Sequence, residues 1–457
     1  MLKLSSVALS WGVALISLPA FAKDPAAPPE EPPVDAGPPP ADAPPAPAPT
    51  PEAPRAAAPI AEAEMKKLLE ELQAEERSRA QAPAIVPDLS KVNLAAGIPG
   101  IQSMNPNLAV ILNAGVASYG VAVASAPGSA ASDEPLRTGG HDLDHSGFTL
   151  QQVELAIGAS VDPYLRFDSN LVFKEGVEVE EAYATSLNLP LNLQARGGAF
   201  YSHFGRQNEQ HPHQWAFIDQ PLIYGLMLGE DGHHGIGGEV SWLSPLPWSL
   251  VVIASAQDSS GACCSITFSP KEEPVPVNSP LDVIYTAAVE QFFPVTDDLS
   301  VLWGLSAQAG PATYFADAGR AELWGTDLLV RYKPTASEGS RWCVDLQAEA
   351  LVRTRHAPGE ALVEDDGGYV HLLWYPSWDY AVGVRYDLAQ ERLDDDPANP
   401  GLGPQNQRGA LLLHWAPSHF SRVRLTAAGG TRGQGDLLWG VMAALEVSIG
   451  AHGAHAF

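Results

Sequence analysis

The sequence predicts an all-β protein, a transmembrane antiparallel β-barrel of about sixteen strands, preceded by a disordered Pro/Ala-rich spacer and one short helix. Three observations support this fold class. Apolar and polar residues alternate in many short runs, short turns alternate with long loops, and aromatic residues gather at the ends of the runs. No apolar run near the length of a membrane-spanning helix follows the first two dozen positions, so strands are the expected means of crossing a membrane.

Composition narrows the possible partners. The chain has 457 residues, 54 of them acidic and 26 basic, with a formal net charge of −28. So acidic a balance argues against nucleic acid as a partner. The 3 cysteines are too few for a disulfide framework.

The first residues predict export. Residues 1–22 have the pattern of a signal peptide, with Lys3, an apolar core over 7–18 and the small-x-small site Ala20-Phe21-Ala22. Combined with a barrel, an exported chain is expected in the outer membrane, with both termini in the periplasm.

Three short segments are expected before the barrel. Residues 23–59 form a Pro/Ala-rich spacer that cannot bury a core. Residues 60–82 contain one amphipathic helix, followed by a connecting segment over 83–106. The helix is either a coiled coil that helps the barrel form a homotrimer or a solitary, partly frayed helix, and its length slightly favours the second. The barrel itself is predicted over 107–457.

Alternation is clearest at the first hairpins. Leu165, Phe167, Leu171 and Phe173 share one face, and Arg166, Asp168, Asn170 and Lys174 share the other. In the next run, Val177, Val179, Tyr183 and Leu187 are expected to face lipid, opposite Glu178 and Glu180. The full set of predicted strands is 107–121, 147–160, 163–174, 177–187, 191–204, 236–243, 248–257, 283–292, 299–308, 323–332, 341–353, 369–376, 379–389, 406–415, 421–429 and 437–457.

Short connections are expected at one rim and long ones at the other, the asymmetry of outer-membrane barrels. The predicted long connections are 122–146, 205–235, 258–282, 309–322, 354–368 and 390–405. The final residue, Phe457, resembles the signal that the outer-membrane barrel-assembly machinery reads.

Charged residues on the polar faces are interpreted as pore lining of mixed sign. They are Arg166, Asp168, Lys174, Glu178, Glu180, Arg196, Asp345, Glu349, Arg353, Arg385, Arg422 and Arg424. The acidic clusters 364–366 and 394–396 are placed in outer loops, where they either collect cations or contact lipopolysaccharide through calcium. The adjacent Cys263 and Cys264 are interpreted as a coincidence, with a strained bridge or a metal site as the alternatives.

Histidines are dense around the 205–235 loop. The candidate metal ligands are His211, His213, His233, His234 and Glu209, because imidazole with carboxylate is the ligand set that zinc prefers. The alternative is a polar loop in which histidine fills space and forms hydrogen bonds. A loop of this length is also expected to fold inward and narrow the pore.

Several motifs resemble a known family. They include Ser103-Met104-Asn105-Pro106-Asn107, Val161-Asp162-Pro163-Tyr164, the segment 208–215 with its His-Pro-His, Asp219-Gln220-Pro221 and the tail 450–457. The chain resembles proteobacterial porin-like outer-membrane proteins labelled zinc-regulated TonB-dependent receptors. The resemblance implies an outer-membrane protein linked to zinc supply, with zinc as the possible cofactor.

The receptor mechanism fits the sequence poorly. A TonB-dependent receptor needs a globular plug ahead of about 22 strands, and here only a spacer and one helix are expected before the barrel. A porin-like channel for small hydrophilic solutes or metal ions is therefore the predicted function, in contact with outer-membrane lipid and lipopolysaccharide. A closed structural or interaction barrel is the alternative. No catalytic motif is present, so an enzyme is not expected.

Overall fold

The computed structural model describes the chain over residues 106–123, 142–143, 145–174, 176–229, 232–258, 267–268, 277–312, 319–334, 342–356, 363–390, 405–432 and 436–450. All sixteen barrel strands lie within these ranges, and they belong to one compact unit of the chain, Ser90–Phe457. The predicted signal peptide, spacer, helix and connecting segment lie outside the described residues. So do Phe457, the cysteine pair and the 394–396 cluster.

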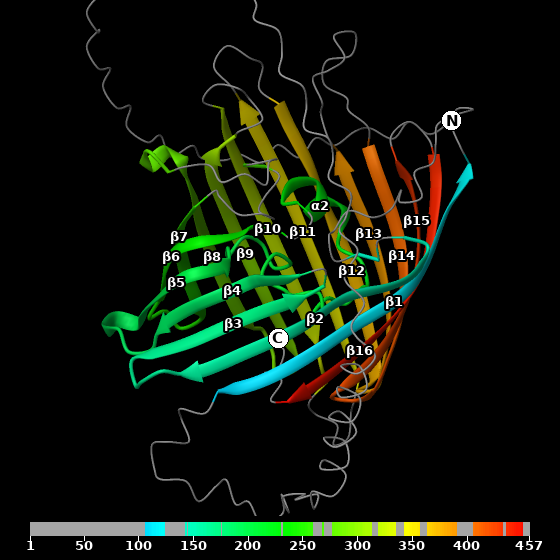
Figure 1. Cartoon of the computed structure of the whole chain (residues 1–457), viewed down its shortest axis with the longest axis horizontal. Coiled ribbons are helices and arrows are strands. Elements are labelled where there is room, and N and C mark those ends of the chain that lie inside the picture. Colours follow the sequence, from blue (N-terminus) through cyan, green and yellow to red (C-terminus); the bar gives the residue numbers. More distant parts are fainter. Residues whose placement is uncertain are drawn as a thin grey trace, which may run out of the picture. The chain divides into compact units, whose positions relative to one another are not determined.

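Sixteen antiparallel strands close into one barrel, which confirms the predicted fold class (Figure 1). Each strand pairs with its neighbours in sequence, and β1 closes the ring on β16. The strands are β1 (Asn107–Val123), β2 (Gly147–Ser160), β3 (Leu165–Phe173), β4 (Val177–Ser186), β5 (Leu193–Tyr201), β6 (His234–Leu243), β7 (Ser249–Asp258), β8 (Val283–Pro294), β9 (Leu299–Pro311), β10 (Arg320–Tyr332), β11 (Cys343–His356), β12 (Val363–Ser377), β13 (Tyr380–Gln390), β14 (Gln405–Ser418), β15 (Ser421–Arg432) and β16 (Asp436–Gly450).

Three short helices accompany the strands in the described part of the chain. They are the 3₁₀ turns η3 (Pro190–Asn192) and η4 (Pro280–Asp282) and the α-helix α2 (Leu222–Met227). None of these described helices has the length and apolar character needed to cross a membrane.

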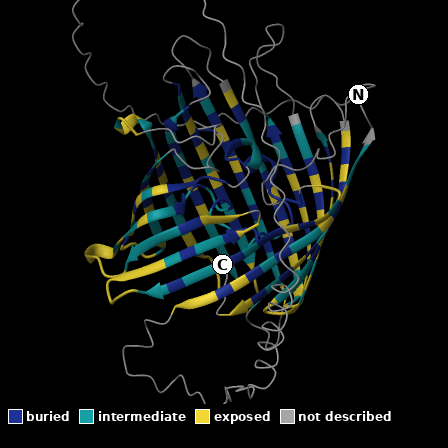
Figure 2. Ribbon diagram, in the orientation of Figure 1, coloured by how far each residue is buried: buried dark blue, intermediate teal, exposed yellow. Residues whose placement is uncertain are grey.

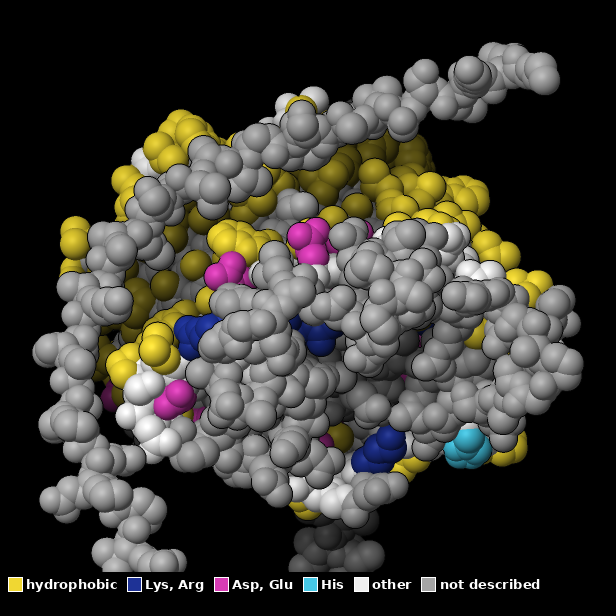
Figure 3. Space-filling view, turned by 90° about the horizontal axis from the view of Figure 1, so that it is seen from above, with side chains coloured by type: hydrophobic (Ala, Val, Ile, Leu, Met, Phe, Trp, Pro, Cys, Tyr) yellow, Lys and Arg dark blue, Asp and Glu magenta, His cyan; other side chains and the backbone are white. Residues whose placement is uncertain are grey.

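The two faces of the barrel wall differ in polarity. Outward side chains are large and apolar, as in Leu411 (61% exposed), Leu413 (55%) and Val441 (53%). Exposed and buried residues alternate along the strands in Figure 2, as expected where one face of each strand is covered. Seen from above in Figure 3, hydrophobic side chains lie along the upper edge and the sides of the molecule, and several acidic and basic side chains lie further in.

One strand starts much earlier than predicted. β12 begins at Val363 rather than at 369, so the 364–366 acidic cluster belongs to a strand and its assignment to an outer loop is wrong. Asp365 is fully buried (0% exposed) and faces the lumen. Its carboxylate accepts hydrogen bonds from Arg353 (2.7 Å) and Arg355 (2.9 Å). Charge pairing across adjacent strands therefore stabilises a segment whose acidic residues suggested a loop.

Two β-bulges interrupt the alternation near the start of the barrel. In the β1–β2 ladder, Asn113 pairs with Gln152 and Ala114 with Leu150, which leaves Gln151 as an extra residue. In the β3–β4 ladder, the register shifts in the same way and leaves Glu180 as the extra residue. A bulge places two consecutive side chains on one face and reverses the parity of the residues beyond it.

The second bulge corrects the predicted face of one aromatic residue. Val177 (66% exposed) and Val179 (50%) face outward, as predicted. Beyond the bulge the parity is reversed, so Tyr183 faces inward, and its assignment to the lipid-facing set is wrong. Its ring lies 5.3 Å from the Arg196 guanidinium inside the barrel.

Candidate functional site: the lumen loop

A long connection folds into the barrel between β5 and β6. We call the segment from Ser202 to His233 the lumen loop; residues 202–229 and 232–233 of it are described. In Figure 1 its helix α2 lies inside the ring of strands. Phe204, Ile223, Tyr224 and Met227 of this loop are fully buried (0% exposed).

Arginines from one side of the barrel bind the main chain of the lumen loop. Their guanidinium groups project inward from β11, β13, β14 and β15 and donate to backbone carbonyl oxygens. The pairs are Arg353 with Leu226 (3.1 Å), Arg385 with Asp219 (2.9 Å), Arg408 with Gln220, Arg422 with His213, and Arg424 with Trp215 (2.8 Å) and Phe217 (3.0 Å). Because buried carbonyls require donors, these contacts replace the hydrogen bonds that the loop loses on leaving water.

Ion pairs reinforce this arginine row. The Asp219 carboxylate lies 2.7 Å from a terminal guanidinium nitrogen of both Arg385 and Arg408. On the wall, Asp387 accepts from the Nε atoms of the same two arginines, at 2.9 and 3.1 Å. Each buried charge therefore has a partner of opposite sign, which such groups need when they leave water.

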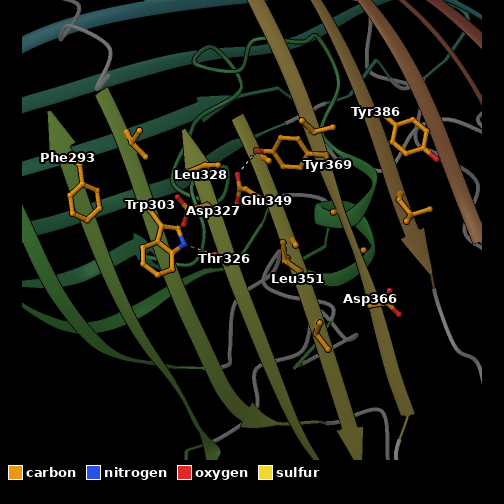
Figure 4. Close-up of a pocket in the computed structure, with 18 residues that line it drawn as sticks. Phe293, Trp303, Thr326, Asp327, Leu328, Glu349, Leu351, Asp366, Tyr369 and Tyr386 are labelled. Atoms are coloured by element: carbon orange, nitrogen blue, oxygen red, sulfur yellow. Dashed lines mark hydrogen bonds between the residues drawn. The ribbon is translucent and has the colours of Figure 1, made fainter. Parts of the chain in front are cut away.

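A second anchor is the buried carboxylate of Glu349 on β11. It accepts hydrogen bonds from the backbone N–H groups of Arg206 (3.0 Å) and Gln207 (3.0 Å). The phenols of Tyr224 (2.5 Å) and Tyr369 donate to it as well, and Figure 4 shows Tyr369 turned toward it. One wall carboxylate thus holds both the start of the lumen loop and its helix.

Apolar packing fills the space around these anchors. Phe217 and Ile218 pack against Leu373, Leu412 and Met442 on the inner wall. The residues of α2 form a second cluster with the wall residues Leu323, Leu351 and Tyr369. The inner wall is therefore not uniformly polar: where the loop covers it, inward positions are apolar.

Two of the five predicted metal ligands meet carboxylates from the opposite wall. His211 Nδ1 lies 2.9 Å from Glu180 Oε2, and its Nε2 lies 3.0 Å from Glu181 Oε2. His213 Nδ1 lies 2.9 Å from Glu154 Oε2 on β2. One donor atom each from Glu154, Glu180 and His211 lies within 4.8 Å of the others.

The other three predicted ligands contact different partners. Glu209 pairs with His203 (2.6 Å), which also contacts Glu239 (2.8 Å) beside Arg196. His233 Nδ1 lies 2.8 Å from Ser202 Oγ, and His234 stacks edge-on against Tyr201 at 4.9 Å between ring centroids. Of the predicted set, the structure therefore brings only His211 and His213 into one stack, with 5.6 Å between ring centroids.

The loop histidines differ in how readily they take a proton. Burial alone would lower the pKa of His203, but the carboxylates of Glu209 and Glu239 raise it to about 10. Burial likewise opposes the charge on His211, and Glu154 and Glu180 raise its pKa well above the usual value. Burial lowers the pKa of His233 to about 3. The neighbouring carboxylates therefore favour a proton on His203 and His211, whereas burial favours the neutral form of His233.

The residues predicted to line the pore fall into three groups. Arg166 pairs with Asp168 at 2.7 Å in an exposed position, and Lys174 and Glu178 are also exposed. Arg196 and Asp345 are partly buried or buried and pair with Glu239 and Arg331. The remaining six contact the lumen loop rather than open space: Glu180, Glu349, Arg353, Arg385, Arg422 and Arg424.

A polar cavity of about 840 Å³ remains below the loop, toward the rim of short turns. Arg206, Gln207, Gln210 and Gln214 of the loop form part of its lining. The facing wall supplies Gln347, His371, His414 and the ion pairs Arg331–Asp345 and Arg422–Glu446. The described residues therefore leave a polar compartment inside the barrel wall.

A second hollow, of about 940 Å³, runs along the wall over β8–β13 (Figure 4). The small residues Ala348, Ala350 and Gly368 line it, together with Trp303, whose indole N–H donates to Thr326 Oγ1 at 3.1 Å. Its lining is mostly apolar, in contrast to that of the cavity inside.

Sequence reasoning missed Glu154, Glu181 and Arg408. Each stands at an inward position of its strand, but the bulges conceal the parity of the first two. The signals were pairs of adjacent polar residues within alternating strands, Gln151-Gln152 and Glu180-Glu181. For the arginine row, the sequence signal is the presence of arginine at inward positions of β11, β13, β14 and β15.

The Glu349 anchor predicts that its loss exposes the start of the lumen loop. In Glu349→Ala, two backbone N–H groups and two phenols lose their acceptor, at about 1–3 kcal/mol for each group left unpaired. Arg206 is the sole Lys or Arg between 202 and 233, so the rate of tryptic cleavage after it measures how exposed the start of the lumen loop is. Cleavage after Arg206 in folded protein should accelerate at least about ten-fold. Glu322→Ala, on the exposed face of β10, is the control and should cut at the wild-type rate; equal rates in both variants would contradict the anchor.

No family model matches this chain. It is 32% identical over 311 residues to a protein of Aquifex aeolicus that is described only as uncharacterized. The match covers 63% of this chain and 65% of the Aquifex protein, so it spans slightly less than two thirds of that relative.

Several solved structures share the barrel at low identity. OprB of Pseudomonas putida has a TM-score of 0.49 at 10% identity and covers 76% of this chain and 94% of its own. The anion-selective porin of Comamonas acidovorans has a TM-score of 0.48 at 10% identity, covering 76% and 99%. The outer-membrane channel DcaP of Acinetobacter baumannii has a TM-score of 0.46 at 13% identity, covering 76% and 96%. Likeness at this level does not assign the chain to any of their families, and none of these names carries the zinc-regulated receptor label.

Proposed function

We propose that this chain is a porin-like outer-membrane channel for small hydrophilic solutes or ions. The observation that carries the proposal is the polarity of one closed wall: large apolar side chains face out along most of the ring, and the buried charged side chains face in. A barrel of this kind is stable in a bilayer because closure leaves no unpaired edge and lipid meets only apolar surface.

The lumen loop is the element that determines which solutes can pass through the barrel. It contacts β2 and β4 through His211 and His213 and the opposite wall through the arginine row. Solute that enters from the short-turn rim reaches the polar cavity of about 840 Å³ and meets the glutamines of the loop. The cavity is lined by paired charges of both signs, and such a lining suits small polar solutes better than strongly charged ones.

Assembly and partners follow from the same location. Lipid and lipopolysaccharide would contact the apolar wall, and the barrel-assembly machinery would insert the chain. A homotrimer would form if the 60–82 helix acts as a coiled coil. No catalytic role is proposed. A link to zinc supply, which the family resemblance implies, is addressed below from the residues themselves.

One observation favours a second candidate, a closed barrel with a structural or interaction role. The lumen loop packs into the barrel with fully buried apolar side chains, as a core does. Conductance separates the two candidates, because a closed barrel is silent both with and without its loop anchors.

A substitution in the lipid-facing wall tests membrane insertion. Leu411 lies at the middle of β14 and is 61% exposed. Leu411→Arg should reduce the free energy of folding into phospholipid vesicles by about 2–4 kcal/mol, as expected for Arg at the midplane. The control is Ile449→Arg, at the end of β16, where the same charge should cost at most about 1 kcal/mol. Equal effects at both positions would contradict a membrane-embedded wall.

Release of the loop tests the channel. Asp219→Ala removes the loop carboxylate that binds Arg385 and Arg408, while Asp387 stays on the wall to pair with both. In planar bilayers, single-channel conductance should rise at least about two-fold over wild type. Asp297→Ala, on an exposed turn between β8 and β9, should conduct like wild type. Silence of wild type and Asp219→Ala alike would favour the closed barrel.

A further inference from the structure

Two β-bulges turn three carboxylates, those of Glu154, Glu180 and Glu181, toward the same region of the barrel interior. Phe148 (86% exposed) and Leu150 (45%) face outward, so unbroken alternation would turn Glu154 outward as well. The bulge at Gln151 reverses this parity and brings Glu154 inside. The bulge at Glu180 brings Glu180 and Glu181 inside together. All three are buried, at 1%, 2% and 8% exposure.

The lumen loop places two imidazoles against these carboxylates. His211 Nδ1 lies 2.9 Å from Glu180 Oε2 and 4.0 Å from Glu154 Oε1. His213 Nδ1 lies 2.9 Å from Glu154 Oε2. Both histidines are nine-tenths or more buried, at 5% and 4% exposure. One imidazole nitrogen and two carboxylate oxygens, from three separate segments, therefore lie within 4.8 Å of one another, and His213 adds a second imidazole beside Glu154.

The spacing of these donors suits a small divalent cation. Zinc binds histidine nitrogen and carboxylate oxygen at about 2.0–2.2 Å in a tetrahedron, so neighbouring donors stand about 3.3 Å apart. The donor separations of 2.9 and 4.0 Å bracket that value. Two histidines with two carboxylates favour zinc over calcium or magnesium, which prefer oxygen alone.

Outer partners hold the donors in the required orientation. With His211 Nδ1 directed at the site, its Nε2–H can donate to Glu181 Oε2 at 3.0 Å. A carboxylate behind a metal-binding histidine is the usual way in which its tautomer is fixed. Gln152 Nε2 donates to Glu154 at 3.2 Å, while the buried Oε1 of the same amide has no hydrogen-bond partner in the described structure. Glu154 and Glu181 form ion pairs only with histidines among the described residues.

A neighbouring histidine–carboxylate cluster differs because an arginine already supplies positive charge to it. His203 lies between Glu209 and Glu239, and Arg196 lies 2.9 Å from Glu239. A permanent cation already compensates this second cluster. Among the described residues, the ion pairs of Glu154 and Glu181 are with His211 and His213 and not with an arginine. A bound divalent cation would therefore add the positive charge that buried carboxylates require.

We propose that Glu154, Glu180, His211 and His213 bind a zinc-type divalent cation that fastens the lumen loop to β2 and β4. This set retains two of the five ligands predicted from sequence and replaces His233, His234 and Glu209 with the two wall carboxylates. The cation would hold the loop on the side of the barrel opposite the arginine row. The proposal does not depend on whether the barrel conducts.

The first test is zinc binding to the full-length, refolded and chelator-treated chain, measured by calorimetry. The double variant Glu154→Gln/Glu180→Gln should lose one tight site per chain, or bind zinc at that site at least about 100-fold more weakly. His203→Ala is the matched control, because it removes a loop histidine from the compensated cluster, and its binding should equal that of wild type. Zinc binding that is the same in the double variant and wild type would overturn the proposal.

A second test needs no variant. Wild-type crystals grown with zinc should give an anomalous scattering peak at the zinc edge between His211 Nδ1 and Glu154. No peak at this point would overturn the proposal and leave a proton on His211 as the sole bridge between the carboxylates. Zinc should also slow tryptic cleavage after Arg206 in wild type and leave it unchanged in Glu154→Gln/Glu180→Gln.

Discussion

The structure depends on one kind of contact: inward arginines that bind the backbone carbonyls of a loop. A segment that leaves water to enter a barrel loses hydrogen bonds to every peptide group, and it stays inside only where donors and acceptors replace them. Arg424 satisfies Trp215 and Phe217, and Arg385 satisfies Asp219. Between these hydrogen bonds, the apolar loop residues Phe217 and Ile218 pack against small wall residues such as Ala410 and Ala444. The interior wall is thus shaped to the loop, and the loop determines what space is left.

The barrel was predictable from sequence because its signal repeats. Each strand has one face toward lipid and the other toward the interior, so the alternation of apolar and polar residues recurs in all sixteen strands. An error in assigning one strand therefore does not change the predicted fold. β12 illustrates such an error: its acidic start suggested a loop, but Asp365 is paired with Arg353 and Arg355. Long-range pairing supplied a stability that local composition could not reveal.

The site was only partly predictable, for a specific physical reason. Its carboxylates reach the interior through bulges, and a bulge is a departure from the alternation used to assign faces. Alternation predicts an inward Glu180 but gives no reason to choose Glu154 or Glu181. Histidine density indicates the loop but cannot distinguish His211, which contacts carboxylates on β2 and β4, from His233, which hydrogen-bonds to Ser202 and to Gln308 on β9. Partners distant in sequence decide which role each histidine has.

The lumen loop is therefore held from two sides by different chemistry: permanent ion pairs and carbonyl contacts on β11–β15, and a histidine–carboxylate cluster on β2 and β4. The first depends on the chain alone, whereas the second has donors that a cation can join. A loop held in this way divides the lumen at a fixed position, and passage is limited by the polar cavity beside it. Ions that compete for the cluster would act on the less permanent of the two attachments.

Hydrogen exchange of the lumen loop, measured by mass spectrometry on folded protein, tests this account most directly. If wall groups hold the loop, peptides from Gly205 to Phe217 will exchange over hours, because the N–H groups of Gly205, Arg206 and Gln207 donate to Ser306 and Glu349. Exchange of these peptides within seconds, at the rate of an unstructured chain, would show that the loop is not held inside the barrel and would contradict the account.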